Sequence, residues 1–154
     1  MSKNWLKYSN EVKKEWVCQQ GISLRKVSRC QTANEAVEFI IKNKLTAANL
    51  SEYPDLTDSD LEKLVKDCPQ LNFLIIKSNE ITGDKLADAL KAFTKLQHLN
   101  LLCCQQIFEG LLVDALKELP QLQHLDLSHC QQITGDKLAD ALQFPFQNVN
   151  PCAA

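Results

Sequence analysis

Three residue types in the second half of the chain could do chemistry together: a cysteine, histidines and an aspartate. Cys103, His124 and Asp126 are the types that a thiol hydrolase uses as nucleophile, general base and orienting carboxylate. His98, His124 and His129, together with Asp126, are types that bind zinc. Either chemistry needs side chains that converge on one point. The elements that carry these residues therefore decide whether it can occur.

A pattern of leucines recurs at nearly constant spacing through this part of the chain. Segments of the form L-x-x-L-x-L begin at Leu71, Leu96 and Leu122, which are 25 and 26 positions apart, and a weaker copy begins at Leu45. Alternation within each segment predicts a short strand with one buried face, and apolar residues at helical spacing follow it. One such unit cannot bury its apolar face alone, so the units are expected to stack.

Two further stretches repeat along with the leucines. The ten residues Ile81 to Leu90 recur unchanged as Ile133 to Leu142, and the threonine at the second position of each copy stands where a helix N-cap is expected. Cys104-Gln-Gln-Ile107 recurs as Cys130-Gln-Gln-Ile133. A small, nearly apolar side chain at such a corner can pack under the strand, so both cysteines are predicted to be buried structural thiols.

These repeats resemble those of the leucine-rich repeat proteins. The period, the corner cysteines, the Ile-Thr-Gly-Asp tetrapeptides and the Cys68-Pro69-Gln70-Leu71 lead-in resemble the cysteine-containing, ribonuclease-inhibitor-like subtype best. The resemblance implies an α/β leucine-rich repeat solenoid, a right-handed α/β horseshoe arc with short parallel strands on the concave face and helices on the convex face. Binding of a protein partner is the commonest work of such a fold. Nearly identical neighbouring repeats on a short chain also resemble the eukaryotic-like repeat effectors that intracellular bacteria deliver to host cells.

The chain divides into three parts on this interpretation. Residues 1–44 are expected to form a helical N-terminal cap with a divergent first unit, residues 45–142 four leucine-rich repeats, and residues 143–154 a C-terminal cap or tail. Within the tail, Phe144 and Phe146 are expected to fold over the last unit.

The N-terminal cap is expected to contain two helices. One amphipathic helix is predicted from Ser9 to Gln20, ended by Gly21 and followed by a strand remnant from Ile22 to Leu24. Thr32-x-x-Glu35 is a capping box that predicts a second helix. An F-box is the alternative for this region, but the Leu-Pro opening of that motif is absent.

Composition narrows the class of partner. The net charge is −2, from 17 basic and 19 acidic residues, so no strong field exists to gather nucleic acid or anionic membrane. Seven cysteines, an odd number without a C-x-x-C pair, disfavour both a disulfide framework and a zinc ribbon, and indicate a reducing compartment. No leader or membrane span is legible, so a cytoplasmic location is expected, in a host cell's cytosol if the chain is delivered there.

The positions between the leucines are predicted to face outward, in rows that run across the strands. The rows are Ala47, Phe73, His98 and His124; Asn49, Ile75, Asn100 and Asp126; Ser51, Lys77, Leu102 and Ser128; and Glu52, Ser78, Cys103 and His129. Phe73, Ile75 and Leu102 are large apolar residues at positions expected to be exposed, and such a group usually marks a contact surface. The alternative is that N-terminal residues or a neighbouring turn cover Phe73 and Ile75.

The leading hypothesis is a monomeric interaction protein without cofactor, metal or catalytic residues. Its concave face would bind another folded protein, an enzyme or a fellow effector, and would inhibit an enzyme whose active site it occludes. The expected partner-binding residues are Phe73, Ile75, Lys77, His98, Asn100, Leu102, Cys103, His124, Asp126 and His129. A ubiquitin-ligase substrate adaptor is a second hypothesis. A thiol or metal enzyme is disfavoured, because parallel strands present side chains in parallel and offer no oxyanion donors or lid.

Overall fold

Five short strands form one parallel sheet, in the order in which they occur along the chain. The computed structural model describes residues 29–138 and 148–150. The strands are β1 (Ala47–Asn49), β2 (Phe73–Ile76), β3 (His98–Leu101), β4 (His124–Asp126) and β5 (Asn148–Asn150), and each pairs with the next. The α/β class and the short parallel strands that the resemblance implies are therefore confirmed.

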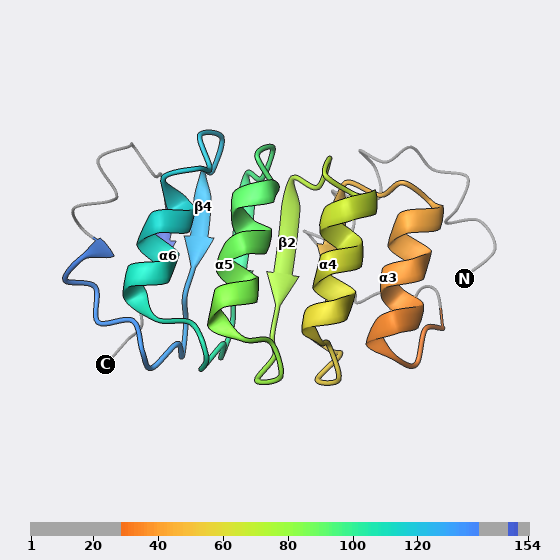
Figure 1. The fold of residues 1–154 in the computed structure, drawn as a ribbon, viewed down its shortest axis with the longest axis horizontal. Helices are drawn as coiled ribbons and strands as arrows, with labels where there is room; N and C mark the ends of the chain where they lie inside the picture. The colour runs from red at the N-terminus through yellow and green to blue at the C-terminus, as the bar shows by residue number, and fades with distance from the viewer. Residues whose placement is uncertain (1–28, 139–147, 151–154) are drawn as a thin grey trace.

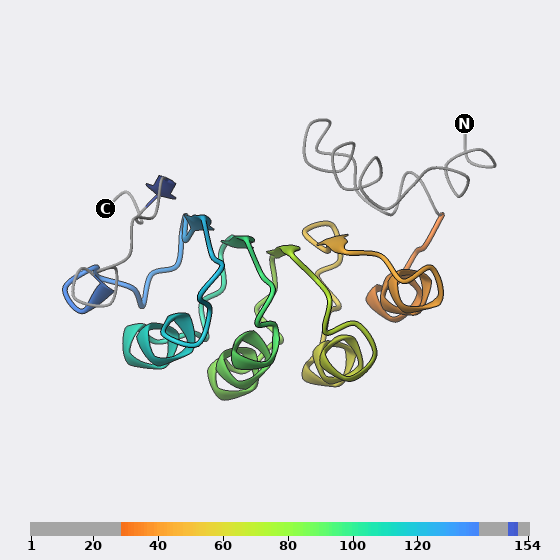
Figure 2. The same cartoon turned by 90° about the horizontal axis from the view of Figure 1, so that it is seen from above.

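Four helices of the described chain lie on one side of this sheet. They are α3 (Ala33–Lys42), α4 (Asp58–Asp67), α5 (Gly83–Ala92) and α6 (Glu109–Leu116), and they stand side by side in front of the strands in Figure 1. Seen from above, helices and strands form two rows, and the row of strands lies on the inner side of a shallow curve (Figure 2). We call the side of the sheet away from these helices the strand face.

The strands pair in the register that the repeat predicts. Phe73 lies opposite His98, and His98 lies opposite His124. In the next outward-facing row Ile75 pairs with Asn100, and Asn100 with Asp126. The first two of the four predicted rows are therefore confirmed, because a shift of one residue would have turned every one of these side chains to the other face.

The leucines of the repeat form a continuous core between the sheet and the helices. Leu74, Leu99 and Leu125 are buried in it at equivalent positions of neighbouring strands. Cys104 and Cys130 are buried at the corners, as predicted. Each thiol contacts a backbone carbonyl in the strand of the preceding unit. The Cys104 Sγ lies 3.8 Å from the carbonyl oxygen of Ile76, and the Cys130 Sγ lies 2.7 Å from that of Leu101.

The corner of the second unit differs from the prediction. The sequence predicts Ser78 on the strand face, and it predicts that Asn79, where the corner motif of the other units is replaced, bonds the backbone of the turn. Instead Ser78 is buried, and its hydroxyl donates to the carbonyl oxygen of Leu56 at 2.9 Å and accepts from the N–H of Glu80 at 3.0 Å, while Asn79 is exposed. This unit is one residue shorter, so counting back from the helix places Ser78, rather than Asn79, at the position that Cys104 occupies in the next unit.

Threonines begin three of the four described helices. Thr32 caps α3 by accepting from the N–H of Glu35 at 3.3 Å, and Thr57 forms a reciprocal capping box with Asp60 at the start of α4. Thr82 begins α5 as predicted, but its side chain makes no capping bond within that helix. The start of α4 is thus capped from within its local sequence. The start of α3 also involves a neighbouring unit, because the N–H of Ala33 donates to the carboxylate of Asp55 at 3.0 Å. The start of α5 likewise involves a neighbouring unit, because Thr82 donates to the carboxylate of Asp58.

The predictions for the two ends of the chain have different outcomes. The segment after residue 142 was expected to hold only a cap or tail, yet β5 adds a fifth parallel strand in which Asn148 pairs with His124. The helix predicted for Ser9 to Gln20, the strand remnant after it, and the placement of Phe144 and Phe146 lie outside the described residues. Within the described ranges, no helix combines the length and apolar character needed to cross a membrane.

Candidate functional site: the strand face

An aromatic ladder crosses three neighbouring strands on the strand face. The rings of Phe73 and His98 are tilted by 39°, with centroids 5.4 Å apart. The rings of His98 and His124 are stacked, with centroids 3.9 Å apart and planes 21° apart. Direct register between the strands brings these side chains together, and packing between the rings restricts their rotamers.

Phe73 is not the exposed anchor that the sequence predicted. Only 6% of it is exposed, and it forms a small cluster with Ala47, against which Ile75 packs. Ala47 is its direct neighbour on β1, and so small a side chain leaves room for the phenylalanine ring, while His98 packs on its other side. The alternative of cover by N-terminal residues involves residues outside the described ranges. Phe73 is therefore a packed residue that contacts Ala47 and His98, and it offers little surface to a partner.

The remaining apolar positions of the face are partly exposed. Ile75 and Leu102 are half-buried, as are His98 and His124. The prediction of three exposed apolar residues is thus wrong for Phe73 and met only in part by Ile75 and Leu102. Together these four half-buried side chains make a surface that is neither core nor fully solvated.

The polar side chains of one outward-facing row, Asn49, Asn100 and Asp126, form hydrogen bonds within the protein. Asp126 accepts a hydrogen bond from the Nδ2 of Asn100 at 3.0 Å, and its other oxygen accepts from the N–H of Ser128 at 2.9 Å and from the Ser128 hydroxyl. Asn49, which is buried, binds the N–H and hydroxyl of Ser51 in the same way. Asn49 and Asp126 therefore stabilise the turns that follow β1 and β4.

Two residues at the end of the face adopt left-handed backbone conformations. Cys103 has a φ of 58° and His129 a φ of 63°, at equivalent positions after β3 and β4. The two turns are joined, because the N–H of Cys103 donates to the carbonyl oxygen of Ser128 at 3.1 Å and the Gln105 side chain donates to that of His129 at 2.7 Å. Left-handed geometry costs a non-glycine residue about 1 kcal/mol, so these contacts hold strained turns in place.

The site residues predicted at this end of the face differ in exposure. Cys103 is half-buried, whereas His129 and Lys77 are exposed. Burial raises the pKa of the neighbouring Cys104 thiol, and a hydrogen bond with the Ser78 backbone opposes that shift only in part. Cys104 is thus held in its neutral form, which is unsuited to nucleophilic chemistry.

The geometry gives little support to the two chemistries considered first. His98 and His124 lie ring over ring, which places their nitrogens side by side rather than around one point. In the part of the chain that the structure describes, no group of three His, Cys, Asp or Glu side chains is placed to hold a metal ion. The Asp126 carboxylate is already bound by Asn100 and Ser128.

One exposed aromatic residue was not predicted from the sequence. Phe108 begins α6, is 54% exposed, and occupies the position at which Thr57, Thr82 and Thr134 stand in the other units. A comparison of the helix starts across the repeat could have found it. Phe108 lies at the start of a helix rather than in a strand, so it is not part of the ladder.

No protein-family model matches the chain, and a search of curated proteins finds no match either. Function is therefore inferred from the geometry of the strand face and from the repeat pattern.

Proposed function

We propose that the chain is a leucine-rich repeat protein that binds another folded protein. Its strands would form the concave face of a right-handed solenoid, and its helices the convex face. Support comes from the period of the leucines, the sequential order of the parallel strands and the placement of α3 to α6 on one side of the sheet. The strand face is the proposed binding surface.

The observation that carries this proposal is the group of half-buried side chains on the strand face, His98, His124, Ile75 and Leu102. Stacked His98 and His124, flanked by Ile75 and Leu102, combine apolar area with polar ring atoms, a composition typical of the centre of a protein interface. The register of the strands holds these side chains in place before binding. Little side-chain entropy remains to be lost on association, which favours affinity.

The mechanism we propose is occlusion by a pre-formed surface. Lys77 and His129 are exposed at the ends of their strands and would form part of the polar rim. A partner enzyme whose active site docks on the ladder would be inhibited, and a fellow effector would be held or regulated in the same way. Binding of this kind needs no cofactor and no catalytic residue in this chain.

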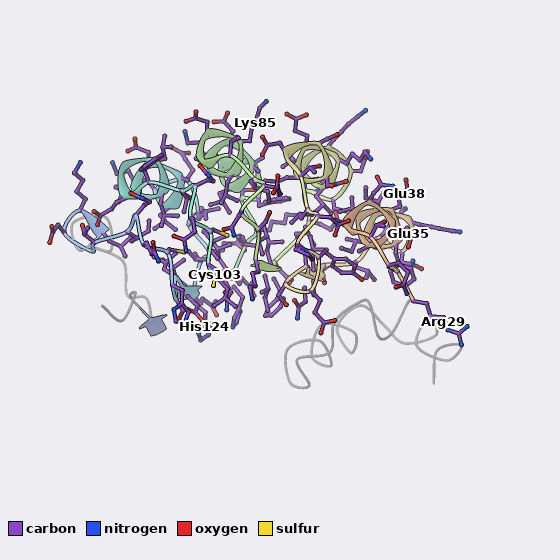
Figure 3. All side chains as sticks on the ribbon, turned by 90° about the horizontal axis from the view of Figure 1, so that it is seen from below. Arg29, Glu35, Glu38, Lys85, Cys103 and His124 are labelled. Carbon is purple, nitrogen blue, oxygen red and sulfur yellow. The ribbon has the colours of Figure 1, made fainter. Side chains whose placement is uncertain are left out.

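The test compares proteins captured by the wild-type chain and by two double variants. In Leu102→Asp/His124→Asp, charges replace half-buried groups of the strand face. In the matched control Glu62→Ala/Lys85→Ala, an exposed ion pair is removed from the helix side, where the two side chains lie 2.8 Å apart. Figure 3 shows Lys85 and His124 on opposite sides of the molecule.

Circular dichroism would first establish that both variants are folded. We expect a partner that is captured by the wild type and the control but not by the strand-face variant. If that partner is an enzyme, its activity should fall in the presence of the wild-type chain. Identical captured proteins for all three chains would mean that the contacts lie on another surface and would contradict the proposal.

A further inference from the structure

Six described residues of the repeated sequence, Ile81 to Leu86 and Ile133 to Leu138, adopt two conformations in this chain. In the first copy, Ile81 to Leu90, helix α5 begins at Gly83, directly after Thr82. In the second copy, Gly135 has a φ of +93°, the next two residues form a turn, and Leu138 is the first helical residue. Because the two sequences are identical, the difference must come from contacts outside the repeated segment.

An acidic residue of the preceding unit contacts each copy, and the two acids differ in length. Asp58 is the first residue of α4, and its carboxylate accepts from the N–H and hydroxyl of Thr82 at 2.9 and 3.0 Å. Glu109 is the first residue of α6 and accepts from the hydroxyl of Thr134 at 2.8 Å. The aspartate thus reaches only the N-cap residue of the following unit.

The longer glutamate reaches further into its neighbour. Glu109 also accepts from the N–H of Lys137 at 3.0 Å and from that of Leu138 at 3.2 Å. Its side chain has one more carbon than that of Asp58, which accounts for the extra reach. These bonds satisfy N–H groups that a helix start would otherwise leave to solvent or to a cap.

The two glycines also differ in what faces them. A Cβ atom on Gly83 would overlap the carbonyl oxygen of Gln106, whereas a Cβ on Gly135 would meet no atom within 4 Å. The turn before α6, which contains Gln106, therefore packs directly against Gly83. No described contact of this kind holds Gly135 in a helical conformation.

We infer that Glu109 is a clasp that holds residues 134–138 in a non-helical start, and that these residues can switch to the helical start of their identical counterpart when the clasp is released. The chain itself demonstrates that the sequence supports both conformations. Glu109 is 9% exposed, and burial would raise its pKa, but the bonds from Thr134 and from the N–H groups of Leu138, Lys137 and Gly135 together lower it. The carboxylate therefore remains charged at neutral pH and can act as a strong acceptor.

Two substitutions of Glu109 in the full chain test this inference by NMR. Glu109→Gln removes the charge, and we expect the Lys137 and Leu138 amides to exchange about tenfold faster, because hydrogen bonds to a charged acceptor are lost. Glu109→Asp shortens the clasp to the length of Asp58. In that variant we expect the Cα chemical shifts of residues 135–137 to move to the helical values that residues 83–85 show in the same spectrum.

A matched control and a milder variant complete the experiment. Asp58→Asn removes the equivalent carboxylate and should leave the exchange of residues 134–138 unchanged. Thr134→Val removes only one bond to Glu109, so we expect a smaller acceleration of amide exchange in this variant. It provides the test if the Glu109 variants fold poorly. Unchanged exchange in Glu109→Gln, or non-helical shifts for residues 135–137 in Glu109→Asp, would overturn the inference.

Discussion

The imidazole rings of His98 and His124 stack on neighbouring strands, with their centroids 3.9 Å apart. The repeated Gln-His-Leu tripeptide places them at the same position in two units, and β3 and β4 pair with these residues directly opposite each other. The two copies of the tripeptide thus contact each other through their histidines. The surface that we propose for partner binding is a direct product of the repeat.

A double-mutant cycle should measure this contact. We expect His98→Ala and His124→Ala to couple by about 0.5–1 kcal/mol in the free energy of unfolding, because aromatic pairs contribute roughly this much beyond their buried area. Urea denaturation of the wild type, both single variants and the double variant gives the coupling. Strictly additive effects would mean that the rings lie together without stabilising each other.

Phe73→Ala should destabilise the protein by about 3 kcal/mol, since the side chain is almost fully buried and its removal leaves a cavity. This expectation reverses the one drawn from the sequence, which treated Phe73 as an exposed anchor. Leu99→Ala, at a core position of the neighbouring strand, provides a reference of about 2–5 kcal/mol. A Phe73 variant with the melting temperature of the wild type would restore it to the candidate binding surface.

Periodicity predicted the parts of the fold that depend on local pattern. The leucine spacing located β1 to β4 and their register, and the threonines Thr32 and Thr82 located the starts of α3 and α5. Periodicity could not predict the burial of Phe73, because that burial depends on the small size of Ala47, its partner on the neighbouring strand. It also could not predict two conformations for one sequence, because contacts from Asp58 and Glu109 decide between them.

Gly83→Ala should be destabilising by about 1–3 kcal/mol, because the added methyl group would overlap the backbone of Gln106. Gly110→Ala is its matched control, since it lies within α6 and its new methyl group would meet no atom within 4 Å. We expect that control to stabilise the protein by about 0.5–1 kcal/mol through helix propensity. Thermal unfolding distinguishes the two, and equal effects would mean that the third unit does not close on Gly83.

The cysteines of the described chain should react with thiol reagents in a fixed order. Cys103 is half-buried, whereas Cys68 and Cys104 are buried and burial raises the pKa of both thiols. Because the thiolate is the reacting form, we expect alkylation at Cys103 well before Cys68 or Cys104. Peptide mapping after a short iodoacetamide pulse measures each site separately. Early modification of Cys104 would indicate that the corner opens in solution.

The stabilising effect of Glu109 should depend on pH in a predictable direction. Hydrogen bonds lower its pKa in the folded protein despite burial, so its contribution to stability is present above the unfolded value, about 4.3, and is lost as pH falls through the lower folded value. We therefore expect the difference in unfolding free energy between the wild type and Glu109→Gln to be constant from pH 7 to about pH 5.5, and to shrink below pH 4. Urea denaturation at each pH gives this difference, in which the titration of the other carboxylates cancels. A difference that grows on acidification would show that Glu109 binds a proton more readily in the folded chain, contrary to the clasp.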